Sequence, residues 1–387
     1  MPANRSIALI LCLTVGFSEA NGQVPAVREV RLGKPSHVLP NGFTRIGGAF
    51  ELPDGRILVT DRGDERVVVA NVETGAMSAV GRAGSGPEEY RIPDRLVQWA
   101  GDSILLVDEG NGRLAVVGPD LRIHRSFVLR VAGVPTGLIP RSVDPAGRML
   151  AQVPRWAAET FGKHGDSVPI VRVAGANTKA EVVAWVRLLA EPPGGIKRGL
   201  PYVPFTPQDV WAATSSGEIA VARSGDFHVE WLNGKGLVRG PAIPYRALAV
   251  TKEDRIAYTR NFLEHSSMGG RGGANQTPTG LSAMPSEWLT PEAVERLAQD
   301  NTFAPDRPPF TDALPLLSRD GRFWVQRSVP EGAEPVWDVF DSRGNPAYRV
   351  VAPTGRRIIA LGRGAAYALT EDADGFEHLE RYAVRLP

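Results

Sequence analysis

The chain has almost no cysteine, because Cys12 is the single one in 387 residues. Cys12 lies in an apolar stretch at residues 7–17, which we expect to be removed with a signal peptide. A mature chain without cysteine would form no disulfides, thiolate metal sites or cysteine nucleophiles. An excess of one charge is also lacking, since 44 Lys and Arg balance 43 Asp and Glu. The formal net charge of +1 provides no overall field for nucleic acid, and we expect none as a partner.

No apolar run is long enough to span a bilayer. The run at residues 7–17 follows Arg5 and is followed by the small residues Ala20 and Gly22. A short apolar core with these flanks is typical of a secretory signal, cleaved after one of the two small residues. We therefore expect residues 1–22 to be a signal peptide. The mature protein would be secreted or periplasmic, with no membrane span after cleavage, and we expect a monomer.

Common catalytic motifs are lacking as well. The sequence contains no Gly-x-Ser-x-Gly elbow, phosphate loop or helix-loop-helix calcium loop. The six histidines are scattered, and no two have the spacing of a metal pair on a strand or a helix. The sequence therefore predicts no histidine metal site and identifies neither a catalytic residue nor a cofactor.

Glycine and proline are abundant, with 42 and 32 residues, and the glycines recur in a pattern. A Gly beside a small or acidic residue stands next to a short apolar run six times, at Gly55, Gly101, Gly147, Gly217, Gly321 and Gly364. The spacings are 46, 46, 70, 104 and 43 residues, and most copies contain a second turn. Two hairpins in a repeat of roughly 40 to 50 residues are typical of a four-stranded propeller blade.

The pattern predicts an all-β fold, a six-bladed β-propeller over residues 27–387. Strands are expected at residues 44–52, 56–60, 66–72 and 76–80 in the first blade, and at 94–99, 103–107, 113–117 and 123–128 in the second. The last blade lacks a fourth strand before the chain ends. Val30 and Leu32 alternate with charged residues, so we expect an N-terminal strand at residues 27–32 to pair with the last blade near residues 382–386. Such a strand closes the ring and removes an open edge.

The two long spacings indicate insertions. The larger one, at about residues 252–309, contains a glycine-rich polar stretch at 266–280 that we predict to be a mobile loop. A helix is expected at residues 290–299, because Thr290 can cap it and Pro291 suits its first position. A seventh blade around residues 247–262 stays open as an alternative.

Two motifs resemble a known family. The first motif is a strand followed by an Asp, a turn and an Arg. It occurs at residues 57–69 and again at residues 104–114, where the turn contains Asn111. The second motif, Gly-Arg-Ala-Gly-Ser-Gly-Pro at 81–87, lies between the two copies. This arrangement resembles the NHL-repeat type of six-bladed propeller over about residues 44–130 and more loosely beyond. The hairpin at residues 337–344 resembles those of exported six-bladed propellers. The resemblance implies the fold, and this fold serves binding modules and several unrelated enzymes.

A few acidic and aromatic residues are candidates for a site. Asp61 and Asp108 recur at the end of a strand, and we expect each carboxylate to bind the following turn, although the alternative is a ligand facing the channel. Glu88, Glu89 and Tyr90 lie in the loop between the first two blades. They could bind a cation or a basic partner there, or Glu88 and Glu89 could be a solvated acidic pair.

Two functions remain open for this sequence. The first is an exported binding module that holds a protein or a small-molecule ligand at the channel mouth. The second is a metal-dependent lactonase-like hydrolase, with a cation in the channel and the helical insertion as a lid. The lactonases that this fold resembles have Glu-Gly-Pro on the first inner strand, where this chain has Gly-Gly-Ala-Phe at 47–50. In the stretch 140–144 only Asp144 could bind a cation, and a single carboxylate holds a divalent ion poorly.

Overall fold

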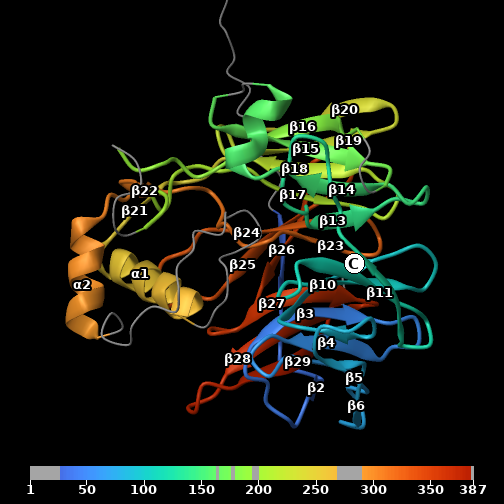
Figure 1. The fold of residues 1–387 in the computed structure, drawn as a ribbon. Helices are drawn as coiled ribbons and strands as arrows, with labels where there is room; N and C mark the ends of the chain where they lie inside the picture. The colour runs from blue at the N-terminus through green and yellow to red at the C-terminus, as the bar shows by residue number, and fades with distance from the viewer. Residues whose placement is uncertain (1–26, 163–164, 176–178, 194–199, 268–289, 385–387) are drawn as a thin grey trace, which may run out of the picture.

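The computed structural model describes residues 27–162, 165–175, 179–193, 200–267 and 290–384. Within these residues the chain forms six blades around a central axis, a six-bladed β-propeller as the sequence predicts (Figure 1). The first three blades are β3 (Ile46–Glu51), β4 (Ile57–Asp61), β5 (Arg66–Ala70) and β6 (Met77–Ala79); β9 (Pro93–Gln98), β10 (Ile104–Asp108), β11 (Arg113–Val117) and β12 (Ile123–Phe127); and β13 (Pro140–Val143), β14 (Met149–Gln152), β15 (Ser167–Val173) and β16 (Glu181–Arg187).

The other three blades follow the same plan. They are β17 (Val210–Ala213), β18 (Ile219–Arg223), β19 (His228–Asn233) and β20 (Gly236–Arg239); β23 (Leu316–Leu317), β24 (Phe323–Gln326), β25 (Val336–Phe340) and β26 (Pro346–Val351); and β27 (Arg357–Gly362), β28 (Ala365–Glu371) and β29 (Glu377–Ala383), completed by β2 (His37–Val38). Two short pairs, β7 (Arg82–Ala83) with β8 (Glu89–Tyr90) and β21 (Leu248–Ala249) with β22 (Asp306–Arg307), and a 3-10 helix η1 (Arg155–Phe161) lie between blades or strands.

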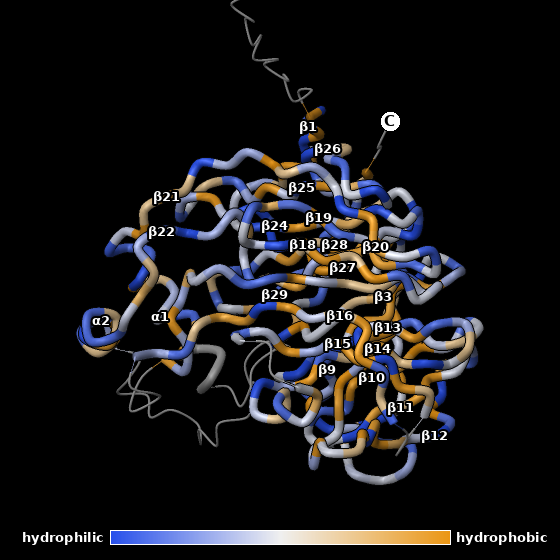
Figure 2. Tube along the Cα trace, turned by 90° about the horizontal axis from the view of Figure 1, so that it is seen from above, coloured by the Kyte–Doolittle hydropathy of each residue, from blue (hydrophilic) through white to orange (hydrophobic). Residues whose placement is uncertain are grey.

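The middle strands of the blades are apolar without interruption because both of their faces are covered. In β4, Ile57 and Val59 pack in one cluster with the sixth blade, whereas Leu58 packs in another cluster with the second blade. Successive side chains of a strand point to opposite faces, so one strand contributes to two interfaces. Figure 2 shows the apolar residues concentrated along these strands. The core of the molecule therefore consists of interfaces between neighbouring blades.

The recurring glycine occupies the turn that follows the innermost strand of a blade. Gly55 and Gly217 have φ values of 87° and 85°, in the left-handed region that favours glycine. The turn residue thus repeats because the same backbone conformation is needed in each blade, which is why the glycine spacing predicts the fold.

The ring is closed by an N-terminal strand, but not by the expected one. Residues 27–32 do not pair with the last blade: β1 (Arg28–Arg31) pairs in parallel with β26 and adds a fifth strand to the fifth blade. The last blade is completed by β2, in which His37 and Val38 pair antiparallel with Arg381 and Glu380 of β29. The alternation of apolar residues identifies a strand but does not choose its partner, and a strand of two residues has no visible pattern.

The insertion after the fourth blade contains two helices, α1 (Lys252–Ser267) and α2 (Pro291–Asp300). The helix predicted at residues 290–299 is confirmed as α2. Thr290 caps it as predicted, since its side chain accepts a hydrogen bond from the backbone N–H of Ala293. At residues 247–262 the structure has a short strand and most of α1, so no seventh blade lies in the described part of the chain. The loop predicted at residues 266–280 falls, from residue 268 onward, outside the described residues.

The two helices lie side by side at one face of the ring, and two views at right angles agree on this (Figures 1 and 2). The Lys252 ammonium forms an ion pair with Glu295, which connects the first turn of α1 to α2. Asp254 pairs with Arg307 of β22, and the Arg307 guanidinium also donates to the Val329 carbonyl at 2.7 Å. The base of the insertion is thus bound to the fifth blade.

Candidate functional site

A cavity of about 950 Å³ follows the propeller axis. The innermost strands β3, β9, β13, β17, β23 and β27 lie next to one another in this order and line it. Residues 312–315, Leu188, Leu189, Tyr202 and Gln208 also line it, as do residues of the turns at 214–218 and 318–321. This volume falls within the range of roughly 300–1,000 Å³ that is usual for small-molecule sites.

The two ends of the channel differ in origin. Four antiparallel strands bring the chain back to the face where it entered a blade, so every innermost strand begins at one face and ends at the other. Connections between blades, including the helical insertion, therefore lie at the face where the inner strands begin, which we name the insertion side. The glycine turns lie at the opposite face, which we name the turn side.

Polar groups of the turn side are bound to one another, either within one turn or between blades. The Arg319 side chain donates to the Glu51 carbonyl at 2.6 Å. The Glu51 carboxylate accepts from the Tyr367 hydroxyl at 2.7 Å and from the backbone N–H of Arg363 at 2.9 Å. Thr214 and Ser216 are hydrogen-bonded to each other within a turn. These bonds hold the turns together and leave little for a ligand.

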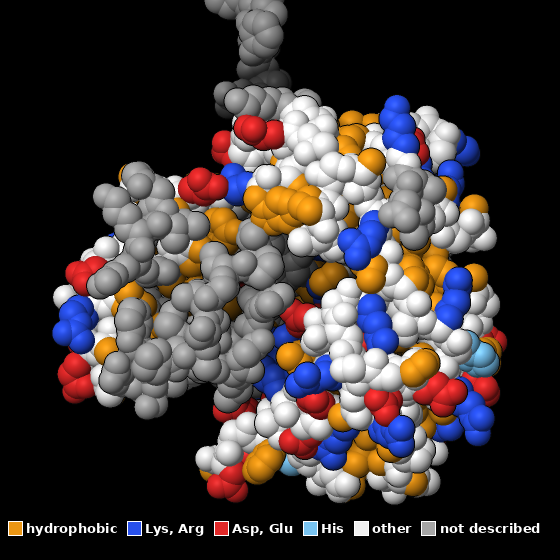
Figure 3. Space-filling view, viewed as in Figure 1, with side chains coloured by type: hydrophobic (Ala, Val, Ile, Leu, Met, Phe, Trp, Pro, Cys, Tyr) orange, Lys and Arg blue, Asp and Glu red, His pale blue; other side chains and the backbone are white. Residues whose placement is uncertain are grey.

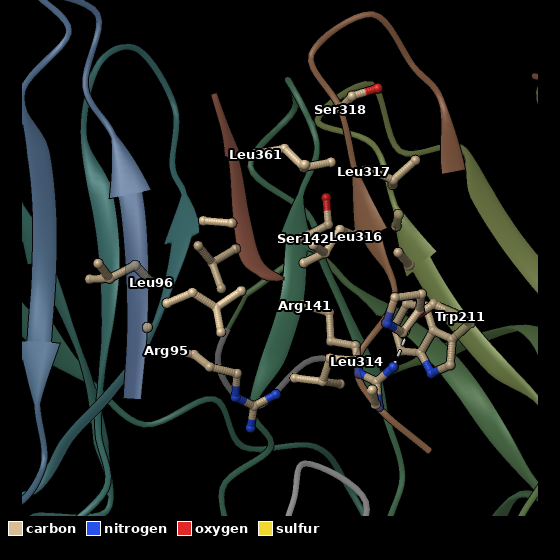
Figure 4. A pocket seen from close by; sticks show the side chains of 18 of the residues that line it. Arg95, Leu96, Arg141, Ser142, Trp211, Leu314, Leu316, Leu317, Ser318 and Leu361 are labelled. Atoms are coloured by element: carbon tan, nitrogen blue, oxygen red, sulfur yellow. Dashed lines mark hydrogen bonds between the residues drawn. The ribbon is translucent and has the colours of Figure 1, made fainter. Parts of the chain in front are cut away.

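The insertion side brings three arginines to the cavity wall: Arg95 at the start of β9, Arg141 at the start of β13, and Arg357 at the start of β27. Arg357 is paired with Glu377, whereas Arg95 and Arg141 come from adjacent strands (Figure 4). The Arg141 guanidinium donates to the Trp211 carbonyl at 2.8 Å and lies 4.5 Å from the centre of the Trp211 ring. Its position deep inside the molecule and the positive charge of Arg95 lower the pKa of Arg141 to about 9. Two basic groups therefore repel each other within the channel.

Arg95 shares its acidic neighbour with another arginine. The Nε atom of Arg95 lies 3.3 Å from the Asp94 carboxylate, and the Arg62 guanidinium binds the other oxygen of Asp94 at 2.8 Å. Arg62 also binds Glu109 at 2.6 Å. Among these side chains and Arg141, positive charges outnumber negative charges by one.

A carboxyl group stands in the same cavity. The Asp312 side chain is exposed to the cavity that it lines, and the protein atoms around it reduce its solvation, which raises the pKa of its carboxyl group. Burial, and then the charge of Asp312, raise the pKa of Tyr258 on α1, with a further contribution from Tyr202. The insertion therefore reaches the surroundings of the channel.

Two aromatic rings pack against Tyr258. The ring of Phe205 lies 5.4 Å from that of Tyr258, and the ring of Phe303 lies 6.2 Å from both. The Arg307 guanidinium lies 5.3 Å from the Phe205 ring. Three segments far apart in the sequence meet here, which fixes α1 against the insertion side of the ring.

The residues singled out from the sequence are not brought together. Glu88, Glu89 and Tyr90 lie in the connection between the first two blades, at the insertion side, whereas Asp144 follows β13 and lies at the turn side. None of the four is among the residues that line the cavity. They do not form one site, because a propeller strand separates its two ends by the thickness of the ring.

Of these four residues, Glu88 is exposed, and the other three have local hydrogen-bond partners. The Glu89 carboxylate accepts from the backbone N–H of Gly86 at 2.7 Å, and this bond, followed by that from Arg82, lowers its pKa. The buried Tyr90 ring packs between two blades, and its hydroxyl accepts from the Val67 N–H at 2.8 Å.

Asp144 is buried in its turn. Its carboxylate accepts from the backbone N–H groups of Ala146 and Arg148 at 3.0 and 2.9 Å, and it forms an ion pair with the Arg148 side chain at 2.7 Å. This geometry gives Asp144 the turn-stabilising role that we expected of the repeated carboxylates Asp61 and Asp108. Ligand contact by Glu88, Glu89, Tyr90 or Asp144 remains an untested prediction.

The structural role expected for Asp61 and Asp108 is confirmed. The fully buried Asp61 carboxylate accepts from four backbone N–H groups and from the Arg66 side chain. Asp108 is equally buried and binds the Arg113 guanidinium at 2.7 Å. Both carboxylates hold turns, as their recurrence with the fold suggested.

The arginines of the channel were not predicted from the sequence. Residues 140–144 were considered only for their carboxylate, because a cation site was the hypothesis. The available signal was a basic residue at the start of two consecutive inner strands, Arg95 and Arg141.

Comparisons with known proteins find solved structures of low similarity. No family model and no curated protein matches this chain. Among solved structures, it is similar to a gluconolactonase from Xanthomonas campestris, with 12% identity, coverage of 89% of this chain and 88% of that one, and a TM-score of 0.42. Regucalcin, a calcium-binding protein from Agrobacterium tumefaciens, shows 12% identity over 93% of this chain and 97% of its own, with a TM-score of 0.41. A PQQ-bound aldose sugar dehydrogenase from Streptomyces coelicolor shows 13% identity over 91% and 98%, with a TM-score of 0.44. The TM-scores of these three structures are below 0.5, and we draw no argument from them.

Two further points concern metal binding and membrane spans in the described residues. No three His, Cys, Asp or Glu side chains in the described ranges are grouped so that they could hold a metal ion. Among the helices that the structure describes, none is both long and apolar enough to cross a membrane. On the face seen in Figure 3, acidic and basic side chains are interspersed over the blades.

Proposed function

We propose that this protein is a binding propeller that holds a small organic molecule in its central channel, toward the insertion side. The observation that carries the proposal is the cavity of about 950 Å³, whose wall combines apolar and polar side chains. At the insertion side the charged residues of the wall are Arg95, Arg141, Arg357 and Asp312. A concave site of this size with apolar surface and convergent polar groups is the usual form of a ligand site.

A metal-dependent lactonase-like hydrolase remains the alternative. Two arginines at the cavity wall oppose it, because their positive charges repel a divalent cation in a weakly solvated channel. Elemental analysis of the purified protein distinguishes the two functions. A stoichiometric divalent cation would favour the hydrolase, whereas the binding function requires none.

The binding proposal is tested by filling the channel. Leu314 lines the cavity and keeps 37% of its surface exposed, so Leu314→Trp can extend into the open space without entering the core. The matched control is Leu237→Trp on β20, at a leucine that is 58% exposed outside the channel. Neutral, anionic and cationic small molecules are screened against the wild type by the shift in Tm, because a ligand of the folded state stabilises it.

Ligands of the channel should lose their Tm shift in Leu314→Trp and keep it in Leu237→Trp. The proposal is wrong if every ligand found binds both variants alike, or if the screen yields no ligand of the wild type.

We also propose that the chain is exported as a monomer. The support is the sequence of residues 1–22, which lie outside the described residues. Mass spectrometry of the protein from the exported fraction should find a new N-terminus between about residues 21 and 24. An intact Met1 in the cytoplasm would refute export, and a sedimentation experiment gives the mass in solution.

A further inference from the structure

The chemistry of the channel wall points to the charge of its ligand. Arg95 and Arg141 come from adjacent inner strands, β9 and β13, and both line the cavity (Figure 4). The two groups are close enough for the charge of Arg95 to lower the pKa of Arg141. A negative charge placed beside them would relieve this repulsion, and a low local dielectric makes the attraction stronger than in water.

The two guanidinium groups are held in place before a ligand arrives. Arg141 donates to the Trp211 carbonyl and stacks over its ring, and Trp211 itself donates from Nε1 to Gln152 at 2.7 Å. Arg95 is held by Asp94, whose second oxygen is bound to Arg62. A preorganised arginine loses less side-chain freedom when it binds a carboxylate.

The wall at this end also has an apolar part. Leu314, Pro315 and Leu316 line the cavity there, beside polar residues that include Asp312, Gln208 and Arg357. A compact dianion such as phosphate has no apolar part to cover the leucines, whereas a carboxylate on an apolar body matches both parts of the wall.

We propose that Arg95 and Arg141 bind the carboxylate of an organic acid, whose apolar body lies along Leu314 and Leu316. The inference rests on the binding function proposed above and names the class of its ligand. The carboxylate accepts hydrogen bonds from the guanidinium groups, and no covalent step is involved.

The experiment uses three probes of equal length: octanoate, its neutral amide octanamide, and octylammonium. Their affinities for the full chain are measured by ligand-detected NMR, together with that of inorganic phosphate. Octanoate should bind about tenfold more tightly than octanamide, because a hydrogen bond with charged partners is the stronger kind. Octylammonium should bind most weakly.

Arg141→Gln should lower the affinity for octanoate about tenfold and leave that for octanamide unchanged, whereas Arg141→Lys should retain part of the preference. The matched control is Arg125→Gln, since Arg125 also stacks over a tryptophan, Trp99 at 5.6 Å, but is exposed on β12 and does not line the cavity. This control should bind all probes as the wild type does. The Tm of each variant shows whether it has folded, and Arg141→Lys carries the test if Arg141→Gln has not.

The outcomes test the organic-acid ligand and the proposed binding function separately. Equal binding of octanoate and octanamide would overturn the inference, and so would phosphate binding as tightly as octanoate with the same dependence on Arg141. If neutral molecules bind in the channel and lose binding in Leu314→Trp, the binding function holds while the organic acid is wrong. If Leu314→Trp affects no ligand, the binding function itself is wrong.

Discussion

The two ends of the channel are built from the same six strands and differ in what their polar groups do. At the turn side, carboxylates such as Glu51 and Asp144 accept hydrogen bonds from backbone N–H groups and neighbouring side chains. At the insertion side, Arg95, Arg141 and Asp312 face the cavity. The turn side repeats with the fold, and repetition constrains its residues to one conformation. The insertion side consists of connections that differ from blade to blade, so chemistry can be added there without disturbing the repeat.

The comparison predicts that turn-side substitutions change stability and not binding. Asp144→Ala should lower the free energy of unfolding by about 2–3 kcal/mol, since it removes the acceptor of two backbone N–H groups in a buried turn. Chemical denaturation measures this loss, and octanoate titration should show the wild-type affinity.

The matched control for this prediction is Asp320→Ala, because Asp320 lies in the equivalent turn of the fifth blade but is exposed. Its effect should stay within about 0.5 kcal/mol. If Asp144→Ala abolished binding while the protein kept its stability, the division between the two ends would be wrong.

Much of the propeller could be predicted from sequence because each blade needs the same turn. Gly55 and its equivalents mark that turn, and the apolar runs after them predict the strands of the first two blades to within about two residues. Asp61 and Asp108 could be interpreted for the same reason, since their spacing follows the repeat. Features that recur at the same position of each repeat can be recognised from one sequence alone.

The rest depends on which strands meet in space. The strand that closes the ring, His37–Val38, is too short for any pattern, and residues 27–32 pair instead with β26. Helix α1 had a start signal that was overlooked, as Thr251 and Asp254 each accept a hydrogen bond from the backbone N–H of the other. Arg95 and Arg141 are 46 positions apart and look like ordinary strand arginines until the ring places β9 beside β13.

The insertion should be separable from the blades. Thr290→Ala removes the N-cap of α2 and should destabilise this helix by about 1 kcal/mol. Hydrogen exchange would show faster exchange in residues 291–300, with blade strands such as β10 unchanged. Thr290→Ser keeps the cap hydroxyl and should exchange like the wild type. Faster exchange throughout the blades would mean that insertion and ring unfold as one unit.

The smallest expected effect concerns Asp312 and depends on pH. Burial raises the pKa of this carboxyl group, so the folded protein keeps its proton at a pH where the unfolded chain has already lost it. Between the ordinary Asp pKa and the raised one, the folded state binds more protons than the unfolded state, and the free energy of unfolding falls as pH rises. Asp312→Asn cannot ionise and escapes this loss. Its stability relative to the wild type should therefore increase with pH across that window, measured by denaturation at a series of pH values.

The neighbour of Asp312 supplies the control for this experiment. Tyr258→Phe removes the phenol whose pKa the charge of Asp312 raises, but it leaves the carboxyl group in the channel. The contribution of Asp312 to the pH dependence should persist in Tyr258→Phe and be lost in Asp312→Asn, because the carboxyl group loses the proton in this range. Parallel curves for Asp312→Asn and the wild type would show that Asp312 titrates as it does in the unfolded chain. The insertion side would then be as well solvated as an ordinary surface, and its difference from the turn side would lie in the arginines alone.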